Sequence, residues 1–265
     1  MRIHYAQGTS GMMNLTRRKF LGLGALALPA ALGLNARYVE PTALRVTKLA
    51  AGPGRDCRFV HFSDLHHKGD VRYAAEVVRT INELEPEFVC FTGDLVEKRQ
   101  FGPEALEFIR QIKAPVYGSP GNHDYWSGIS FTEVERAFAA TGGAWLVERS
   151  IVLPKHDLEI AGLTVWSAHT FTERRASRRV ALMHYPLMAN WLGEHRYDLL
   201  LSGHSHGGQI RLPFYGALWL PDAVGPYQLG SYETPAGPLY VSAGIGTYHY
   251  PLRWNCPPEI TLVTM

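Results

Sequence analysis

LLLSGHSHGGQ, residues 199–209, is the stretch that decides the fold. An apolar run that ends at a glycine is typical of a buried strand followed by a tight turn. On an extended backbone, side chains two residues apart point the same way, so we expect His204 and His206 to face one side of a cleft at the strand end. Neutral imidazole is a common ligand of zinc, iron and manganese. The stretch therefore predicts a strand that carries part of a metal site.

The bulk composition fits one α/β domain of ordinary size. The chain has 265 residues, of which 46% are hydrophobic and 19% charged, enough apolar residues for a sizeable core. Its net charge is +2 and its basic residues are dispersed, which argues against a specific nucleic-acid partner. Cys57, Cys90 and Cys256 lack CxxC spacing. We therefore expect buried structural thiols rather than a disulfide framework or a thiolate zinc site.

Residues 1–36 are expected to be an export signal or a membrane anchor. The sequence TRRKFL, residues 16–21, opens an apolar run that continues to Leu34. This run of about 15 residues is shorter than the roughly 20 that span a bilayer. The paired arginines resemble a bacterial twin-arginine signal, which exports folded proteins. We expect the periplasm, the outer face of the inner membrane or the cell wall, with peripheral membrane contact through the N-terminus. Residues 37–55 are interpreted as a linker or lead-in strand.

Strands and helices alternate over the first half of the body. Strands are expected at residues 57–62, 88–91 and 116–118, and helices at 71–84, 103–112 and 131–140. This order predicts a parallel sheet whose ligands lie at the carboxyl ends of the strands. From Trp145 the pattern changes to short strands. These are expected at residues 151–153, 158–160, 163–168, 180–183, 210–212, 239–243 and 259–265.

Polar clusters follow five of these strands. They are Asp64-x-His66, Gly93-Asp94, Gly121-Asn122-His123-Asp124, His184 and Gly203-His204-x-His206. Each has an ordinary reading by itself, because an aspartate after a strand is often a helix cap or part of a turn. Their joint order and spacing predict one site.

With these residues the sequence resembles the calcineurin-like metallophosphoesterases, whose signature is DxH…GDxx…GNH[DE]…H…GHxH. The match is complete from Asp64 to His206. It is most similar to a bacterial branch that has an export signal, a GGQIRLP segment (here residues 207–213) and an NCPPEI segment (here residues 255–260). The resemblance implies a metallophosphoesterase domain over residues 56–265, built as a four-layer α/β/β/α sandwich of two mixed sheets.

The resemblance also implies a role for each motif residue. Asp64, His66 and His206 would bind one metal ion, Asn122, His184 and His204 a second, and Asp94 both. Asp64 is a further candidate for the position between the ions. His123 would be a catalytic histidine and not a ligand. The acid that orients His123 is open between Glu97 and Asp124.

The residue types suit this chemistry. Two divalent ions bring four positive charges, of which Asp64 and Asp94 neutralise only two, so the site favours an anionic phosphoester. A shared carboxylate holds two ions about 3.5–4 Å apart, and water on such ions ionises near neutral pH. We therefore expect hydrolysis of a phosphodiester or phosphomonoester by a two-metal hydroxide mechanism with Mn, Zn or Fe. His123 would protonate the leaving group or stabilise its charge.

The substrate is less constrained than the reaction. Residues 214–254 are rich in aromatics, which serve core packing or, where exposed, a lipid-linked or nucleotide-like substrate. Arg211 and Arg253 are candidates for a phosphate contact. The alternative enzyme is a UDP-2,3-diacylglucosamine pyrophosphatase-like enzyme of lipid A synthesis. A binding protein without catalysis and a structural zinc protein are the other classes, and the lack of thiolate ligands disfavours the second.

Overall fold

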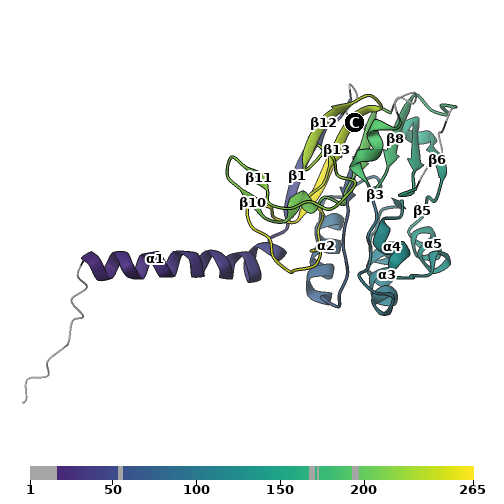
Figure 1. Cartoon of the computed structure of the whole chain (residues 1–265). Coiled ribbons are helices and arrows are strands. Elements are labelled where there is room, and N and C mark those ends of the chain that lie inside the picture. Colours follow the sequence, from purple (N-terminus) through teal and green to yellow (C-terminus); the bar gives the residue numbers. More distant parts are fainter. Residues whose placement is uncertain (1–16, 53–55, 167–170, 172, 193–196) are drawn as a thin grey trace, which may run out of the picture.

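The computed structural model describes residues 17–265 apart from 53–55, 167–170, 172 and 193–196 (Figure 1). Two mixed six-stranded sheets form the body. The first sheet has the order β1 (Arg45–Ala50), β14 (Glu259–Thr264), β2 (Arg58–Phe62), β3 (Val89–Phe91), β4 (Val116–Gly118) and β5 (Ala144–Trp145). The second has the order β12 (Gly230–Thr234), β13 (Gly237–Val241), β9 (Leu199–Ser202), β8 (Arg178–Leu182), β7 (Leu158–Gly162) and β6 (Arg149–Leu153).

Helices cover the outer face of the first sheet. They are α2 (Val71–Glu83), α3 (Gly102–Arg110) and α5 (Phe131–Ala140), drawn together below the sheets in Figure 1. α2 begins where the Asp70 carboxylate accepts a hydrogen bond from the Tyr73 amide at 3.1 Å. Val77, Val78 and Ile81 then repeat at helical spacing and are buried against the sheet. The helices expected from periodicity in the sequence therefore form the outer layer.

The two sheets enclose a second apolar core, and a third lies on the outer face of the second sheet. Phe59 and Phe88 of the first sheet stack at 4.7 Å within the core between the sheets. The expected sandwich of two mixed sheets is confirmed. Among the described residues, however, the fourth layer consists of the short 3₁₀ helix η5 (Pro186–Asn190) and loops rather than long α-helices.

Most of the expected elements are present, with one clear exception. The strand expected at 163–168 is wrong for its described part, residues 163–166, and residues 167–168 lie outside the described residues. Leu163 still donates to the carbonyl of Leu182 at 2.9 Å. Thr164 then turns to the Glu148 carboxylate, to which its amide donates at 3.0 Å. The side-chain partner draws the chain away from the sheet.

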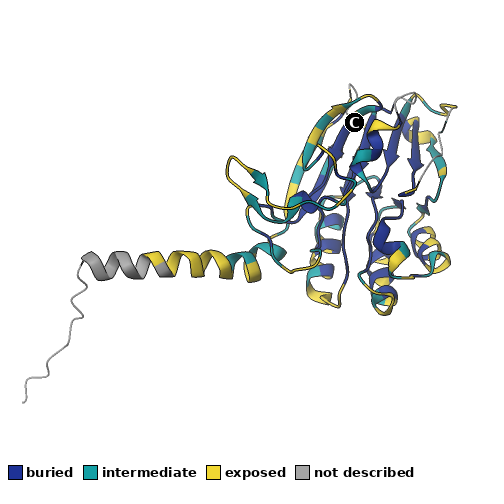
Figure 2. Cartoon of the chain, in the orientation of Figure 1, coloured by how far each residue is buried: buried dark blue, intermediate teal, exposed yellow. Residues whose placement is uncertain are grey.

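The leader region ends in helices and an edge strand. α1 (Arg17–Leu34) extends away from the body (Figure 1), and η1 (Asn35–Val39) and η2 (Glu40–Thr42) lead to β1. The half of α1 nearer the body exposes Leu28, Leu32 and Leu34 (Figure 2). Among the described residues, none of the helices has the combined length and apolarity that crossing a bilayer requires. Residues 1–16 of the expected signal lie outside the described part of the chain.

Candidate metal centre

The loops that follow five strands meet at one edge of the two sheets. β2, β3 and β4 run parallel, as do β8 and β9, so their carboxyl ends deliver the polar clusters to one place. The sequence pattern predicted that an extended backbone would point these side chains to one side. The backbone at these residues is not extended. Left-handed backbone occurs at the residues Asp64, His66, Asp94, His204 and His206, with φ between 44° and 66°. Such strain in non-glycine residues gathers at functional sites.

Asp94 lies at the centre of the cluster. Its Oδ2 atom is 3.3 Å from Nε2 of His66 and 3.2 Å from Nε2 of His184. Its Oδ1 atom accepts a hydrogen bond from the His123 amide at 2.7 Å. One carboxylate therefore contacts imidazoles from both ligand sets that the family motif implies.

The first set, Asp64, His66 and His206, converges on one point. The Nε2 atoms of His66 and His206 are 3.1 Å apart, and Nε2 of His206 is 3.5 Å from Oδ1 of Asp64. The backbone amide of His204 donates to both oxygens of Asp64, at 3.0 and 3.1 Å. Two imidazole nitrogens and a carboxylate directed at one point are the donor set of a divalent ion.

The second set, Asp94, His184 and His204, forms a neighbouring group. Nδ1 of His184 lies 2.7 Å from the carbonyl oxygen of Thr92, which fixes the ring and leaves Nε2 toward Asp94. Nε2 of His204 lies 2.7 Å from the carbonyl oxygen of Asp222. A backbone carbonyl therefore holds each ring in place, as is usual for metal-binding histidines.

Buried polar atoms without partners test whether ions fit here. Oδ1 of Asn122 is buried and accepts no hydrogen bond. An unsatisfied buried acceptor is costly, and a cation next to it removes that cost. The residues present therefore fit divalent ions, and Asn122 lies beside the same cavity as Asp94 and His204.

The pKa shifts of the buried histidines and of Asp94 also indicate a site for cations. Burial opposes the charged form of His66 and His184, yet the neighbouring Asp94 carboxylate raises the pKa of each to about 9. Burial likewise opposes ionisation of Asp94, but His184 and His66 hold its pKa well below the ordinary value. Burial lowers the pKa of His204 to about 3, so that its ring is neutral. The carboxylates thus collect positive charge, which bound ions would supply in place of protons.

His123 is placed by Glu97 rather than by Asp124. Oε2 of Glu97 lies 3.0 Å from Nδ1 of His66 and 3.5 Å from Nδ1 of His123. Asp124 instead accepts hydrogen bonds from the backbone amides of Asp94 and Leu95, each at 2.9 Å. The hydrogen bond from His66 lowers the pKa of Glu97 to about 2, while burial lowers that of His123 to about 4. Glu97 is therefore a fixed negative charge behind both rings.

A cavity of about 470 Å³ opens in front of these groups. Besides the expected ligands, it is lined by Tyr248, from the aromatic segment noted in the sequence, and by Trp126 and Tyr185, whose roles the sequence pattern did not reveal. Tyr185 directly follows His184, and Trp126 comes two residues after Asp124, which was the available signal. The phosphate contact suggested for Arg253 is wrong, because its buried guanidinium donates to backbone carbonyls, including that of Ala243 at 2.9 Å.

An apolar groove adjoins this cavity. It has a volume of about 500 Å³ and shares His206, Trp219, Pro221 and Tyr248 with the metal cleft. Of the aromatics noted in the sequence, Tyr227 and Tyr240 are buried in the cores, whereas Phe214, Tyr215, Trp219 and Tyr250 are exposed. The aromatic residues of segment 214–254 therefore include both core residues and exposed surface residues.

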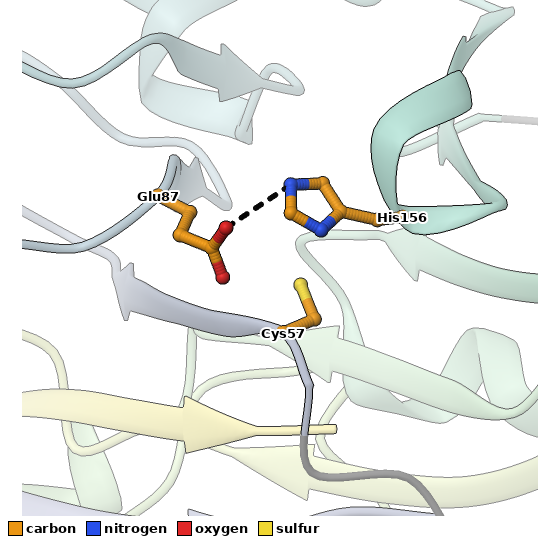
Figure 3. A group of neighbouring side chains, drawn as sticks. All are labelled: Cys57, Glu87 and His156. Atoms are coloured by element: carbon orange, nitrogen blue, oxygen red, sulfur yellow. Dashed lines mark ion pairs between the residues drawn. The ribbon is translucent and has the colours of Figure 1, made fainter.

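A third group of ligand-type side chains lies at the amino ends of the strands. Figure 3 shows Cys57, Glu87 and His156 facing one another, and their ligand atoms lie within 4.8 Å. Lys155 donates to Glu87 at 2.6 Å, which places a positive charge at the carboxylate. Burial raises the pKa of the Cys57 thiol to about 11, so it is protonated at neutral pH. This group is consistent with a structural role, as expected for buried thiols.

Comparison with known proteins agrees with the geometry. The model of the calcineurin-like phosphoesterase family matches residues 57–208. The metallophosphoesterase YkuE of Bacillus subtilis is 33% identical over 96% of this chain and 99% of its own length. Phosphodiesterase YaeI of Escherichia coli is 24% identical over 95% and 99%. UDP-2,3-diacylglucosamine pyrophosphatase LpxG of Chlamydia trachomatis is 27% identical over 90% and 94%. The chain belongs to the calcineurin-like phosphoesterase family and is a metal-dependent phosphoesterase.

Proposed function

We propose that the chain hydrolyses a phosphodiester or phosphomonoester with two divalent ions held around Asp94. The observation that carries this proposal is the contact of one carboxylate oxygen with His66 and His184, which belong to different ligand sets. The proposed ligands of the first ion are Asp64, His66, Asp94 and His206, and those of the second are Asp94, Asn122, His184 and His204. Mn, Zn and Fe all suit these ligands.

The ions would supply Lewis-acid chemistry, which activates water and neutralises the phosphoryl oxygens. The protein contributes the rest. His123 is neutral in the free site because burial lowers its pKa to about 4. An anionic phosphoester beside the ring raises that pKa, so that His123 can donate a proton to the leaving oxygen. Glu97 stabilises the imidazolium through Nδ1, which leaves Nε2 for the substrate.

Metal-dependent turnover of bis-nitrophenyl phosphate tests this proposal. We expect activity with Mn²⁺ or Zn²⁺, two bound ions per chain by elemental analysis, and loss of both in Asp94→Asn. The matched control is Asp157→Asn, an exposed aspartate on the turn before β7. Wild-type protein that binds one ion, or that fails to turn over any phosphoester with either metal, contradicts the proposal.

A second candidate reaction has a specific observation in its favour. The apolar groove beside the metal cleft could hold an acyl chain, and one relative is a UDP-2,3-diacylglucosamine pyrophosphatase. Hydrolysis of the corresponding pyrophosphate bond would release UMP. We rank this reaction second, because export would separate the enzyme from a cytoplasmic nucleotide-sugar. UMP release from that substrate at a rate above phosphodiester turnover would reverse the ranking.

We also propose export of the folded chain by a twin-arginine-type signal. The support is the sequence of Arg17 and Arg18 before an apolar run, together with the exposed leucines Leu28, Leu32 and Leu34 of α1. The test is cell fractionation of the wild type and of Arg17→Lys/Arg18→Lys in a bacterial host. Retention of the variant in the cytoplasm is the expected result, and equal distribution of both proteins contradicts it.

A further inference from the structure

The groove beside the metal cleft is lined largely by apolar side chains. Ile210, Leu218 and Leu252 form much of its wall. The one amide side chain in it, Gln209, donates at 3.2 Å to the carbonyls of Tyr250 and Leu252 and accepts from the Tyr248 amide. With its amide already engaged, this wall suits a hydrocarbon better than a hydrogen-bonding base or sugar.

One wall of the groove continues from a short hairpin that exposes large apolar side chains. The hairpin consists of β10 (Arg211–Leu212) and β11 (Gly216–Ala217), and it projects from the body in Figure 1. At its tip, Phe214 is fully exposed and Tyr215 is 75% exposed. Phe214 also has a left-handed backbone, φ 65°, which is uncommon for a bulky residue. Neither side chain belongs to a core, so the fold does not explain them.

The apolar leader helix is attached at the base of the same hairpin. The Arg211 amide donates to the Trp254 carbonyl at 3.0 Å, and the Arg253 amide donates to the Ala36 carbonyl at 2.9 Å. One short segment thus holds both β10 and the end of the α1 region. The exposed leucines of α1 and the aromatic tip therefore belong to one side of the molecule (Figures 1 and 2). Apolar elements of this kind favour a bilayer interface.

We propose that the substrate is a phosphoester with a hydrocarbon chain, which is drawn from a lipid bilayer into the groove. Phe214 and Tyr215 enter the bilayer interface, and the chain lies along Ile210, Leu218 and Leu252. The groove shares Trp219 and Tyr248 with the metal cleft, so the phosphoryl group reaches Asp94 while the chain occupies the groove. This inference rests on the proposed phosphoesterase function and assigns its substrate class.

Chain-length dependence tests the groove. The probes are 4-nitrophenyl alkyl phosphodiesters with chains from ethyl to decyl, used below their micelle concentrations with the metal-loaded full chain. For the wild type we expect kcat/KM to rise by up to about fourfold per added methylene until the groove is full. Leu218→Ser should flatten this rise. The control Val71→Ser replaces a half-exposed residue of α2 and should behave as wild type.

The outcomes separate the two proposals. Turnover of every probe without chain-length dependence, or a rise that survives Leu218→Ser, overturns the hydrocarbon site and leaves the phosphoesterase intact. Faster turnover of a dinucleotide than of the decyl ester also overturns it. Absence of turnover for all phosphoesters overturns the proposed function itself.

Vesicle binding tests the hairpin independently of activity. The full chain is co-sedimented with phosphatidylcholine vesicles, and Phe214→Ser/Tyr215→Ser is compared with wild type. We expect the partition coefficient to fall by at least about tenfold, because two exposed aromatics lose their apolar contact with the bilayer. Far-UV circular dichroism checks that both proteins are folded. Equal partition of the two proteins overturns the role of the hairpin.

Discussion

The two ends of the sheets each gather side chains that can bind metals, but they differ in their charge balance. At the carboxyl ends, Asp94 is surrounded by imidazoles, and Oδ1 of the nearby Asn122 has no hydrogen-bond partner. At the amino ends, the Glu87 carboxylate is already paired with Lys155 and with the Arg58 amide. In the first group the positive charge comes from protons on His66 and His184, which bound ions can replace, whereas in the second it comes from the ammonium of Lys155. Ligand type alone therefore does not define a metal site.

The largest expected difference concerns the two buried histidines with a glutamate beside them. His123→Ala should lower kcat by about 10²–10⁴-fold, the usual effect of losing a general acid, while two ions per chain are retained. His156→Ala should leave kcat within about twofold, because His156 faces Glu87 at the other end. Steady-state kinetics and metal analysis of both variants check this. Loss of activity in both would show that the two ends are coupled.

The glutamates themselves give a smaller contrast. Glu97→Gln removes the charge that orients His66, and metal affinity should fall by about 10–100-fold. Glu87→Gln is the matched change at the amino ends and should not alter metal affinity. Competition titration with a chelator measures both. An equal loss in the two variants would contradict the assignment of Glu97 as the supporting acid.

Strand β2 joins the two ends, and His61 lies within it. Burial lowers the pKa of His61 to about 3, whereas an unfolded histidine titrates near 6.5. The folded state is thus the weaker proton binder, so its stability is complete above pH 6.5 and is lost as pH falls toward 3. At pH 5 this loss is about 2 kcal/mol. His61→Gln should lack it, so the wild-type advantage in urea unfolding should shrink by that amount between pH 7 and pH 5. Parallel pH profiles would contradict this.

The smallest effect is expected for the thiol at the amino ends. Cys57→Ala removes a fully buried sulfur and should cost about 1 kcal/mol of unfolding free energy. Metal content should stay the same, since the Cys57 thiol is protonated. Calorimetry and elemental analysis check the two expectations. A drop of one zinc ion per chain would instead make the amino-end group a metal site.

The sequence predicted the residues of the site better than the way they are held. The motif order identified Asp64, Asp94 and His204 because ligand chemistry restricts residue type and spacing. It did not reveal their left-handed backbone, since Asp and His adopt that conformation only in a minority of cases. The extended i, i+2 geometry was therefore the wrong physical reason for a grouping that the structure does contain.

Other failures have similar causes. Arg253 looked like a phosphate ligand because charge is visible in a sequence and hydrogen-bond partners are not. The strand expected at 163–168 failed because Glu148, distant in sequence, captures Thr164. Residues 37–55 were expected to be a linker or lead-in strand, and β1 lies within them, but the sequence did not indicate that its partner is β14. Each error concerns a long-range partner, which local periodicity does not encode.

The neighbours of β14 have a consequence for biogenesis. This last strand lies between β1 and β2, so the first sheet stays open along β2 until residues 259–264 leave the ribosome. An unpaired edge in a nascent polypeptide invites aggregation, and such distant pairing slows folding. Completion of the first sheet therefore waits for the synthesis of β14. Any translocation machinery that accepts only finished tertiary structure would have to wait for that final insertion.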